Sequence, residues 1–187
     1  MLDAAGHNVT ALDMSASGVD TKTLEEFGWL KPGFRNGEVP RKDSLAIFVT
    51  AILPDTQHQP SYMLEKFLEK STSGAEEEQD TAVVSSTPFQ LTPIEDLTLL
   101  ALLNRPGSMF VESLSEANKL TDDRYGSVPR VYIVCTEDIL LSPSLQRFMI
   151  EQNEVKEVME IPADHMAVFS KPTELGQCIL ELSQQHA

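Results

Sequence analysis

The chain has 187 residues, which is the size of one domain with a substantial core. Hydrophobic residues make up 41% and charged residues 23%, a composition that excludes a fibrous repeat and a chain disordered throughout. The 29 Asp and Glu outnumber the 14 Lys and Arg, so the formal net charge is −15. Because this charge repels nucleic acid and anionic lipid, neither is expected as a partner.

The cysteines and the N-terminal sequence indicate in which cell compartment the protein is located. Cys135 and Cys178 are too few for a disulfide scaffold, and each lies in an apolar run that suits a buried, reduced thiol. The N-terminus lacks the basic and apolar regions of a signal peptide, and no apolar stretch approaches the length of a membrane span. We therefore expect a cytoplasmic protein without a membrane segment.

The sequence pattern in the first quarter of the chain predicts strands separated by a linker. A short strand is predicted over residues 8–12 and a brief helix over 23–29, and Pro and Gly then break regular structure as far as Lys42. Residues 45–49 are a continuous apolar run stopped by Pro54. This pattern is typical of a central parallel strand that is covered on both faces.

The middle of the chain predicts helices separated by a loop. Residues 60–70 carry apolar side chains at helical spacing. Residues 71–87 consist largely of Ser, Thr, Gly and acidic residues, which predicts a mobile surface loop. Thr92 as N-cap and Pro93 in the first helical position predict a helix to about residue 104, and a further helix is predicted over 109–117.

The last third alternates between strands and helices. Strands are predicted over 130–135 and 155–161, and helices over 142–153 and 173–185. Strands that alternate with helices imply right-handed crossovers and a mostly parallel sheet with helices on both faces. The sequence therefore predicts one α/β domain over residues 1–187.

Two loops carry the residues of chemical interest. In an open parallel sheet, functional residues gather at the carboxyl ends of the strands. Asp138 follows strand 130–135 and His165 follows strand 155–161, which is the arrangement of the orienting acid and the general base in a hydrolase triad. The alternative is that Asp138 caps the next helix and His165 is an ordinary loop histidine, and spacing alone favours this alternative.

Five segments carry a family signature. In chain order they read GHNVTALD from residue 6, FVTAILPD from residue 48, YGSV from residue 125, VYIVCTED from residue 131 and ADHM from residue 163. Together they closely resemble the plant methylesterase and hydroxynitrile lyase family of α/β-hydrolases. The resemblance is collinear and covers most of the chain apart from residues 28–42 and 70–90.

This resemblance implies both a fold and a function. It implies an α/β-hydrolase domain in which residues 55–127 form a helical lid over an apolar pocket, Asp138 is the triad acid and His165 is the triad base. Lyases of the family tend to carry Lys after the histidine, so Met166 favours the methylesterase branch. Intact members of that branch hydrolyse methyl esters of small plant-hormone acids such as salicylate, jasmonate and indole-3-acetate. No cofactor is expected.

The same resemblance exposes what the chain lacks. Family members carry a Gly-x-Ser-x-Gly nucleophile elbow between the first two matching segments, and no such motif occurs in this sequence. They also carry a His-Gly-rich oxyanion loop upstream of the GHNVTALD segment, where this chain begins. The lid is shortened at residues 71–87. We therefore expect an incomplete α/β-hydrolase with negligible ester hydrolysis.

No other residue replaces the missing nucleophile. Cys135 lies within a strand, without the strained turn that projects a nucleophile, and is interpreted as a buried structural thiol. His7, His58 and His186 have no partner at metal-ligand spacing, so no metal site is predicted. Two alternatives stay open beside an inactive hydrolase. The chain is a non-catalytic protein that binds a small apolar ester or acid, or it is an unproductive truncated fragment.

Overall fold

The computed structural model describes residues 45–72, 87–103 and 111–186. The elements predicted over residues 8–12 and 23–29, the linker after them and most of the predicted loop 71–87 lie outside these ranges. The described elements are, in chain order, β1 (Ala46–Val49), α1 (Tyr62–Thr72), the 3-10 turn η3 (Thr87–Phe89), α2 (Ile94–Leu103), α3 (Val111–Glu116), β2 (Arg130–Cys135), α4 (Pro143–Glu151), β3 (Val155–Ile161), α5 (Ala167–Ser170) and α6 (Pro172–Gln185).

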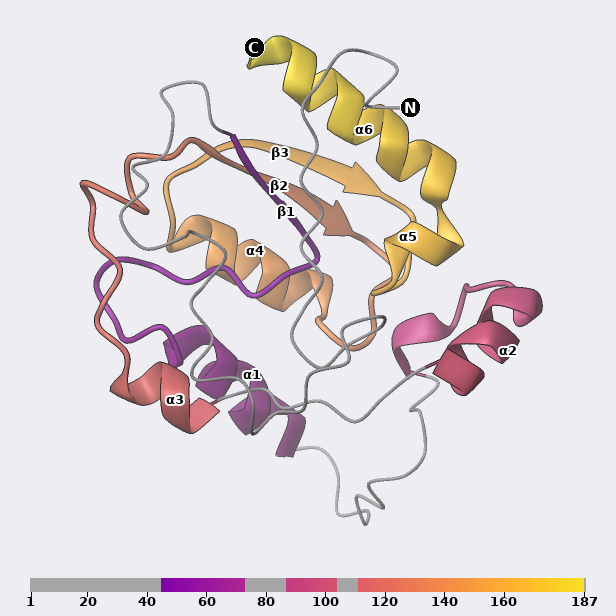
Figure 1. Ribbon diagram of the computed structural model, residues 1–187, viewed down its shortest axis with the longest axis horizontal. Helices are drawn as coiled ribbons and strands as arrows, with labels where there is room; N and C mark the ends of the chain where they lie inside the picture. The colour runs from indigo at the N-terminus through magenta and orange to yellow at the C-terminus, as the bar shows by residue number, and fades with distance from the viewer. Residues whose placement is uncertain (1–44, 73–86, 104–110, 187) are drawn as a thin grey trace.

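Three parallel strands form the described sheet, in the order β1-β2-β3 (Figure 1). The predicted bounds of β2 and β3 are confirmed at both ends. The predicted central position of β1 stays a prediction, because the strand predicted over residues 8–12 lies outside the described residues; within the described sheet β1 pairs with β2, and its residues are half-buried. The fully buried strand is β2, which pairs on both sides. An apolar run reports that a strand is covered by helices but not how many strands it pairs with.

Helices cover both faces of the sheet, as predicted, because successive side chains of β2 point to opposite faces (Figure 1). On one face, Val131, Ile133 and Cys135 pack with residues of α5 and α6. On the other face, Tyr132 and Val134 pack with residues of α4 and α1. The core is therefore two apolar layers, and together with the parallel sheet they make the chain an α/β protein.

The helix starts follow the sequence with one exception. Pro143 and Pro172 open α4 and α6, where the missing backbone N–H costs nothing. The exception is α2, which begins at Ile94, while the Thr92 hydroxyl donates to Oδ2 of Asp164 at 3.2 Å. The predicted start of α2 is therefore wrong by one residue, because Pro93 and not Thr92 lies directly before the helix.

Residues 55–127, which the sequence interprets as a lid, contain α1, α2 and α3. That domain assignment stays a prediction. In the described ranges no helix combines the length and the apolar character that crossing a membrane requires.

Two tyrosine hydroxyls form hydrogen bonds with the backbone of the segment that follows β1. The Tyr132 hydroxyl donates to the carbonyl of Ala51 at 2.7 Å, and the Tyr125 hydroxyl donates to the carbonyl of Pro54 at 2.8 Å. Tyr132 is fully buried, and burial raises its pKa well above the ordinary value of 10.0. Both hydroxyls are therefore protonated donors, and they fix the path of the chain from the sheet toward α1.

Replacing Tyr132 with Phe should lower the free energy of unfolding by about 1 to 3 kcal/mol, because the hydrogen bond from a fully buried ring to the half-buried carbonyl of Ala51 is lost. Tyr125→Phe is the matched control, and it should cost about 1 kcal/mol or less because that ring is less buried. Urea unfolding monitored by circular dichroism measures both values. An equal or larger loss for Tyr125→Phe would contradict this account of the anchoring.

Candidate functional site

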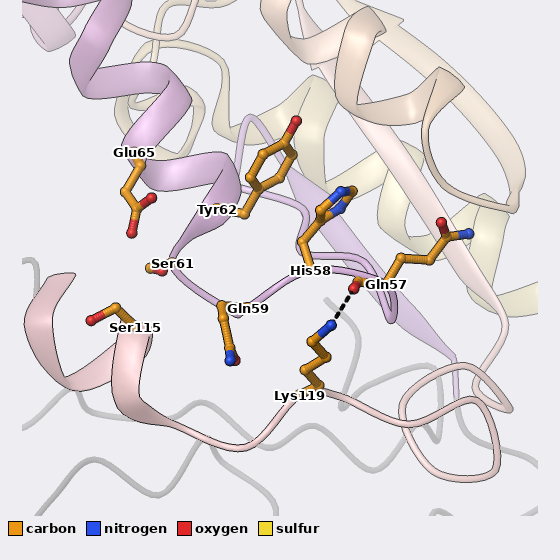
Figure 2. A pocket seen from close by; sticks show the side chains of 8 residues that line it. All are labelled: Gln57, His58, Gln59, Ser61, Tyr62, Glu65, Ser115 and Lys119. Atoms are coloured by element: carbon orange, nitrogen blue, oxygen red, sulfur yellow. Dashed lines mark hydrogen bonds between the residues drawn. The ribbon is translucent and has the colours of Figure 1, made fainter.

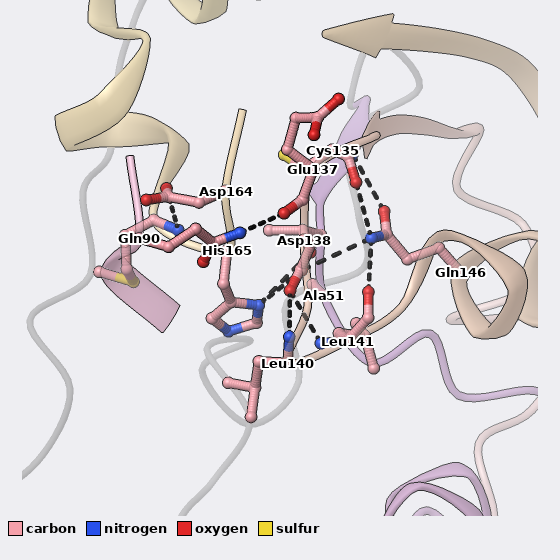
Figure 3. Close-up of polar contacts among 12 residues, drawn as sticks. Ala51, Gln90, Cys135, Glu137, Asp138, Leu140, Leu141, Gln146, Asp164 and His165 are labelled. Atoms are coloured by element: carbon pink, nitrogen blue, oxygen red, sulfur yellow. Dashed lines mark hydrogen bonds and ion pairs between the residues drawn. The ribbon is translucent and has the colours of Figure 1, made fainter. Parts of the chain in front are cut away.

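The carboxylate of Asp138 lies just beyond the carboxyl end of β2, and its side chain is fully buried. Oδ1 accepts hydrogen bonds from the backbone N–H groups of Leu140 and Leu141, both at 2.8 Å. Oδ2 accepts a hydrogen bond from the hydroxyl of Thr50. It also lies 2.8 Å from Nδ1 of His165 (Figure 3). An ionised carboxylate only accepts, so Nδ1 of His165 carries the proton of this bond.

Gln146 of α4 also forms hydrogen bonds with the turn at residues 138–141 that carries Asp138. This fully buried amide donates through Nε2 to the carbonyl of Leu141 at 2.7 Å and to the carbonyl of Cys135 at 3.2 Å (Figure 3). Its Oε1 accepts the backbone N–H of Cys135 at 3.1 Å, and Nε2 also lies 3.5 Å from Oδ2 of Asp138. The amide therefore binds the end of β2 to the turn that carries the acid.

The imidazole of His165 forms a hydrogen bond with the carboxylate of Asp138 through one of its two ring nitrogens. Its Nδ1 faces Asp138, and 26% of the side chain is exposed. Within the described residues no side chain forms a hydrogen bond with Nε2, which is the nitrogen left to accept a proton. A serine hydroxyl within hydrogen-bond reach of Nε2 would contradict the expectation of an inactive site. The candidates for such a hydroxyl are Ser15, Ser17 and Ser44, and all three lie outside the described residues.

Two opposing effects set the charge of Asp138. Burial alone would raise the pKa of Asp138, but hydrogen bonds from His165, Thr50 and the N–H of Leu141 outweigh it and hold the pKa below the ordinary value of 3.8. The carboxylate is therefore ionised at neutral pH. In that state it orients the imidazole and can compensate the charge that the ring gains when it takes up a proton.

The structure brings Asp138 and His165 together, as expected for loops at the carboxyl ends of neighbouring parallel strands. The predicted hydrogen bond between them is present. The alternative of a helix cap does not describe Asp138, because α4 begins after Ser142 and the Asp138 carboxylate instead binds the turn at residues 140–141. An ionised carboxylate and an imidazole therefore lie in hydrogen-bond contact at the carboxyl edge of the sheet.

A second buried carboxylate, Asp164, links the loop after β3 to the start of α2. Its Oδ1 accepts from the N–H of Met166 at 3.0 Å and from the Ser170 hydroxyl at 2.7 Å. Its Oδ2 accepts from the N–H of Leu91 at 2.9 Å and from the hydroxyl of Thr92. Asp164 therefore holds α5 and the segment before α2 in fixed positions beside the histidine loop.

Sequence reasoning missed three of these polar residues. Thr50 is the first residue after β1, so the rule that directed attention to residues after strands would have selected it as well. Asp164 also follows a strand, directly before His165, but its partners were not predicted, and Gln146 carries no such signal. The role of Gln146 depends on the inward face of a helix, and that of Asp164 on a contact with a segment 72 residues away.

Cys135 is an unreactive thiol in this site. Burial, with the nearby carboxylates of Asp138 and Asp164, raises the pKa of the Cys135 thiol from 9.0 to about 12. Because the thiolate is the nucleophilic form, a thiol protonated at neutral pH is a poor nucleophile. This supports the interpretation of Cys135 as a structural residue.

The remaining described histidines pair with carboxylates. Nδ1 of His58 lies 2.7 Å from Oδ2 of Asp55, and Nε2 of His186 lies 3.2 Å from Oε2 of Glu157. His7 lies outside the described residues. In the part of the chain that the structure describes, no three His, Cys, Asp or Glu side chains are grouped so that they could hold a metal ion.

An open groove of about 410 Å³ lies between the start of α1 and the α3 region (Figure 2). The ring of His58 stacks on that of Tyr62 with centroids 4.0 Å apart, and Nζ of Lys119 donates to the carbonyl of Gln57 at 2.8 Å. The groove is lined mainly by polar side chains and includes neither member of the acid–base pair. The groove is therefore separate from the Asp138–His165 pair.

Comparison with known proteins shows which family the chain belongs to. Methylesterase 1 of Arabidopsis thaliana is 36% identical over 233 residues, which cover 99% of this chain and 89% of the relative. Salicylic acid-binding protein 2 of Nicotiana tabacum is 35% identical, with 100% of this chain and 90% of the relative covered. A crystal structure of polyneuridine aldehyde esterase superposes with a TM-score of 0.78 at 29% identity, over 97% of this chain and 90% of that chain. No family model matches the chain.

The parallel sheet, the acid and base at its carboxyl edge and these relatives define an α/β-hydrolase. The chain belongs to the plant methylesterase family, whose members in this comparison are carboxylic-ester hydrolases.

The alignment with the relatives contains gaps in this chain, and these gaps lie in the interior of the alignment. The match to Methylesterase 1 runs over 233 residues, so at least 46 aligned positions have no residue in this 187-residue chain. Because the match uses 99% of this chain and 89% of the relative, these gaps fall between aligned segments. An internal loss of this size is consistent with the missing Gly-x-Ser-x-Gly motif.

Replacing Asp138 with Asn should lower the free energy of unfolding at pH 7 by about 1 to 3 kcal/mol, because buried donors that a carboxylate satisfied then face an amide group. The pKa of Asp138 is lower in the folded than in the unfolded chain, so its contribution to stability is complete above the unfolded pKa and is lost as the pH falls through the folded pKa. The difference between the variant and wild type should therefore shrink below pH 3.8.

Urea unfolding at a series of pH values measures this difference. The control is Glu137→Gln, which removes an exposed carboxylate one residue away and should change stability little. The series extends to pH 2, about two units below the ordinary carboxyl pKa. A destabilisation by Asp138→Asn that stays constant over this whole range would contradict the ionised state assigned to Asp138.

Proposed function

We propose that this chain is a methylesterase-family protein that keeps the acid–base pair of ester hydrolysis, Asp138 and His165, but does not turn esters over. One observation carries the proposal. The pair is assembled with a 2.8 Å hydrogen bond, while the sequence has no Gly-x-Ser-x-Gly motif to supply the hydroxyl that the base would activate. The base is present and its usual partner in the reaction is not.

The expected loss of rate follows from how a triad works. The base removes a proton from the nucleophile, the nucleophile attacks the ester carbonyl, and the base then returns the proton to the leaving alcohol. Without the nucleophile the first step has no hydroxyl to act on, although Asp138 still orients the imidazole. Removal of the nucleophile alone lowers kcat by about 10⁶-fold in a Ser-His-Asp enzyme.

We further propose that the protein binds a small apolar ester or acid. A relative is named for binding salicylic acid, and tomato methylketone synthase I, 29% identical with a TM-score of 0.64, has been solved with 2-tridecanone. Methyl esters of salicylate, jasmonate and indole-3-acetate are the corresponding candidates for this chain. Cys135 and Cys178 are both free, which supports a location in the reducing cytoplasm.

The proposal predicts no hydrolysis of a nitrophenyl ester above the rate with His165→Ala protein. The two proteins should show the same slow release of nitrophenol, because His165 has no nucleophile to activate. Stopped-flow absorbance measures the first turnover as well as later ones. A burst of product stoichiometric with the protein, abolished in the His165→Ala variant, would contradict the proposal.

Thermal unfolding with added salicylate separates the two non-catalytic alternatives. A ligand at about 100 times its dissociation constant stabilises the folded state by about 2.7 kcal/mol, which raises the unfolding temperature. A concentration-dependent increase supports a binding protein. An unfolding temperature that does not change with salicylate or with methyl salicylate favours the truncated fragment.

A further inference from the structure

Thr50 occupies a backbone conformation that its side-chain type rarely adopts. It is the first residue after β1, its φ is 37°, and only 5% of its surface is exposed. A β-branched residue in this left-handed region is an outlier that surrounding contacts must hold in place. One such contact is the Thr50 N–H, which donates to the carbonyl of Ile133 on β2 at 3.1 Å.

The side chain of Thr50 completes a triangle of polar atoms. Its hydroxyl donates to Oδ2 of Asp138, and its Oγ1 lies 3.4 Å from Nδ1 of His165. Nδ1 is itself 2.8 Å from the same Oδ2. The three side chains follow β1, β2 and β3 in turn, so each strand of the described sheet contributes one member.

The position of this hydroxyl excludes it as the missing nucleophile. A triad nucleophile gives its proton to Nε2, on the far edge of the imidazole. The Thr50 hydroxyl lies on the Nδ1 side and directs its own proton to a carboxylate. It acts on the acid, and through the acid on the base.

We propose that Thr50 is a positioning residue for the Asp138–His165 pair. Its hydroxyl fixes Oδ2 of the carboxylate from the β1 side, which holds the imidazole in the tautomer that has its proton on Nδ1. This proposal deepens the proposed function because it concerns the same pair, but it depends on a tautomer and not on turnover.

The other contacts of Oδ2 show why the hydroxyl matters. Besides Thr50 and His165, Oδ2 meets only the distant amide of Gln146 among the described residues, at 3.5 Å. Burial raises the pKa of Asp138, and the hydrogen bonds of His165 and Thr50 are the two largest contributions that lower it. Removing the hydroxyl should therefore weaken both the placement of Oδ2 and the preference for the ionised form.

Three variants of Thr50 separate the hydroxyl from the shape of the side chain, and a variant of His165 assigns its signals. Thr50→Val keeps the branched shape and removes the hydroxyl, and Thr50→Ser keeps the hydroxyl and removes the branch. Thr50→Ala differs from Thr50→Ser by the hydroxyl alone, so this pair decides the question if the Val variant does not fold. His165→Gln identifies the resonances of His165 by their loss.

The measurement is the nitrogen-15 spectrum of the imidazole at neutral pH, with the solvent exchange rate of the Nδ1 proton. Wild type and Thr50→Ser should show one tautomer, protonated at Nδ1. Thr50→Val and Thr50→Ala should show mixed tautomers and an exchange rate at least about tenfold higher, the effect expected for losing a hydrogen bond to a charged group.

Two results would overturn the proposal. In the first, the Val and Ala variants keep the wild-type tautomer and exchange rate. In the second, the Ser variant loses them as fully as the Ala variant, which would make the branched shape and not the hydroxyl responsible. Turnover of a nitrophenyl ester by the wild type would contradict the proposed function and leave this result unchanged.

Discussion

A carboxylate that is removed from water needs hydrogen-bond donors, and the carboxylate of Asp138 receives them from the ends of all three strands of the described sheet. The end of β1 supplies the Thr50 hydroxyl, the turn after β2 supplies two backbone N–H groups, and the loop after β3 supplies His165. Each donor also fixes the element that carries it. The requirement to satisfy one buried charge therefore joins the ends of three parallel strands and creates the acid–base pair at the same time.

The neighbouring carboxylate extends this arrangement to α2. Asp164 accepts from the N–H of Leu91, and Gln90 donates to the carbonyl of Glu137 in the acid loop (Figure 3). The segment before α2 is thus held by both loops of the candidate site. Large apolar residues of α2 remain exposed, among them Ile94 at 69% and Leu102 at 78%, so the contacts of residues 90–92 that connect this helix to the two loops are polar.

Sequence patterns predicted the parts of the molecule that local chemistry determines. β2 and β3 are apolar or alternating runs with clear ends, and parallel pairing then brings the residues after them together, which is why the contact of Asp138 with His165 could be expected. Contacts between distant segments left no such signal. Thr92 has the residue type of an N-cap, yet its hydroxyl binds Asp164, and the positive φ of Thr50 depends on partners that only the folded sheet supplies.

The central claim is that an ordered acid–base pair persists in a chain without a nucleophile. Its most direct test follows methyl salicylate by NMR in the presence of nitrogen-15 labelled protein. The account predicts that the His165 ring signals shift as the ester binds, while the ester methyl signal stays constant and no methanol appears. Methanol release that depends on His165 would contradict the claim, and so would an imidazole that shows no preference for the Nδ1 proton.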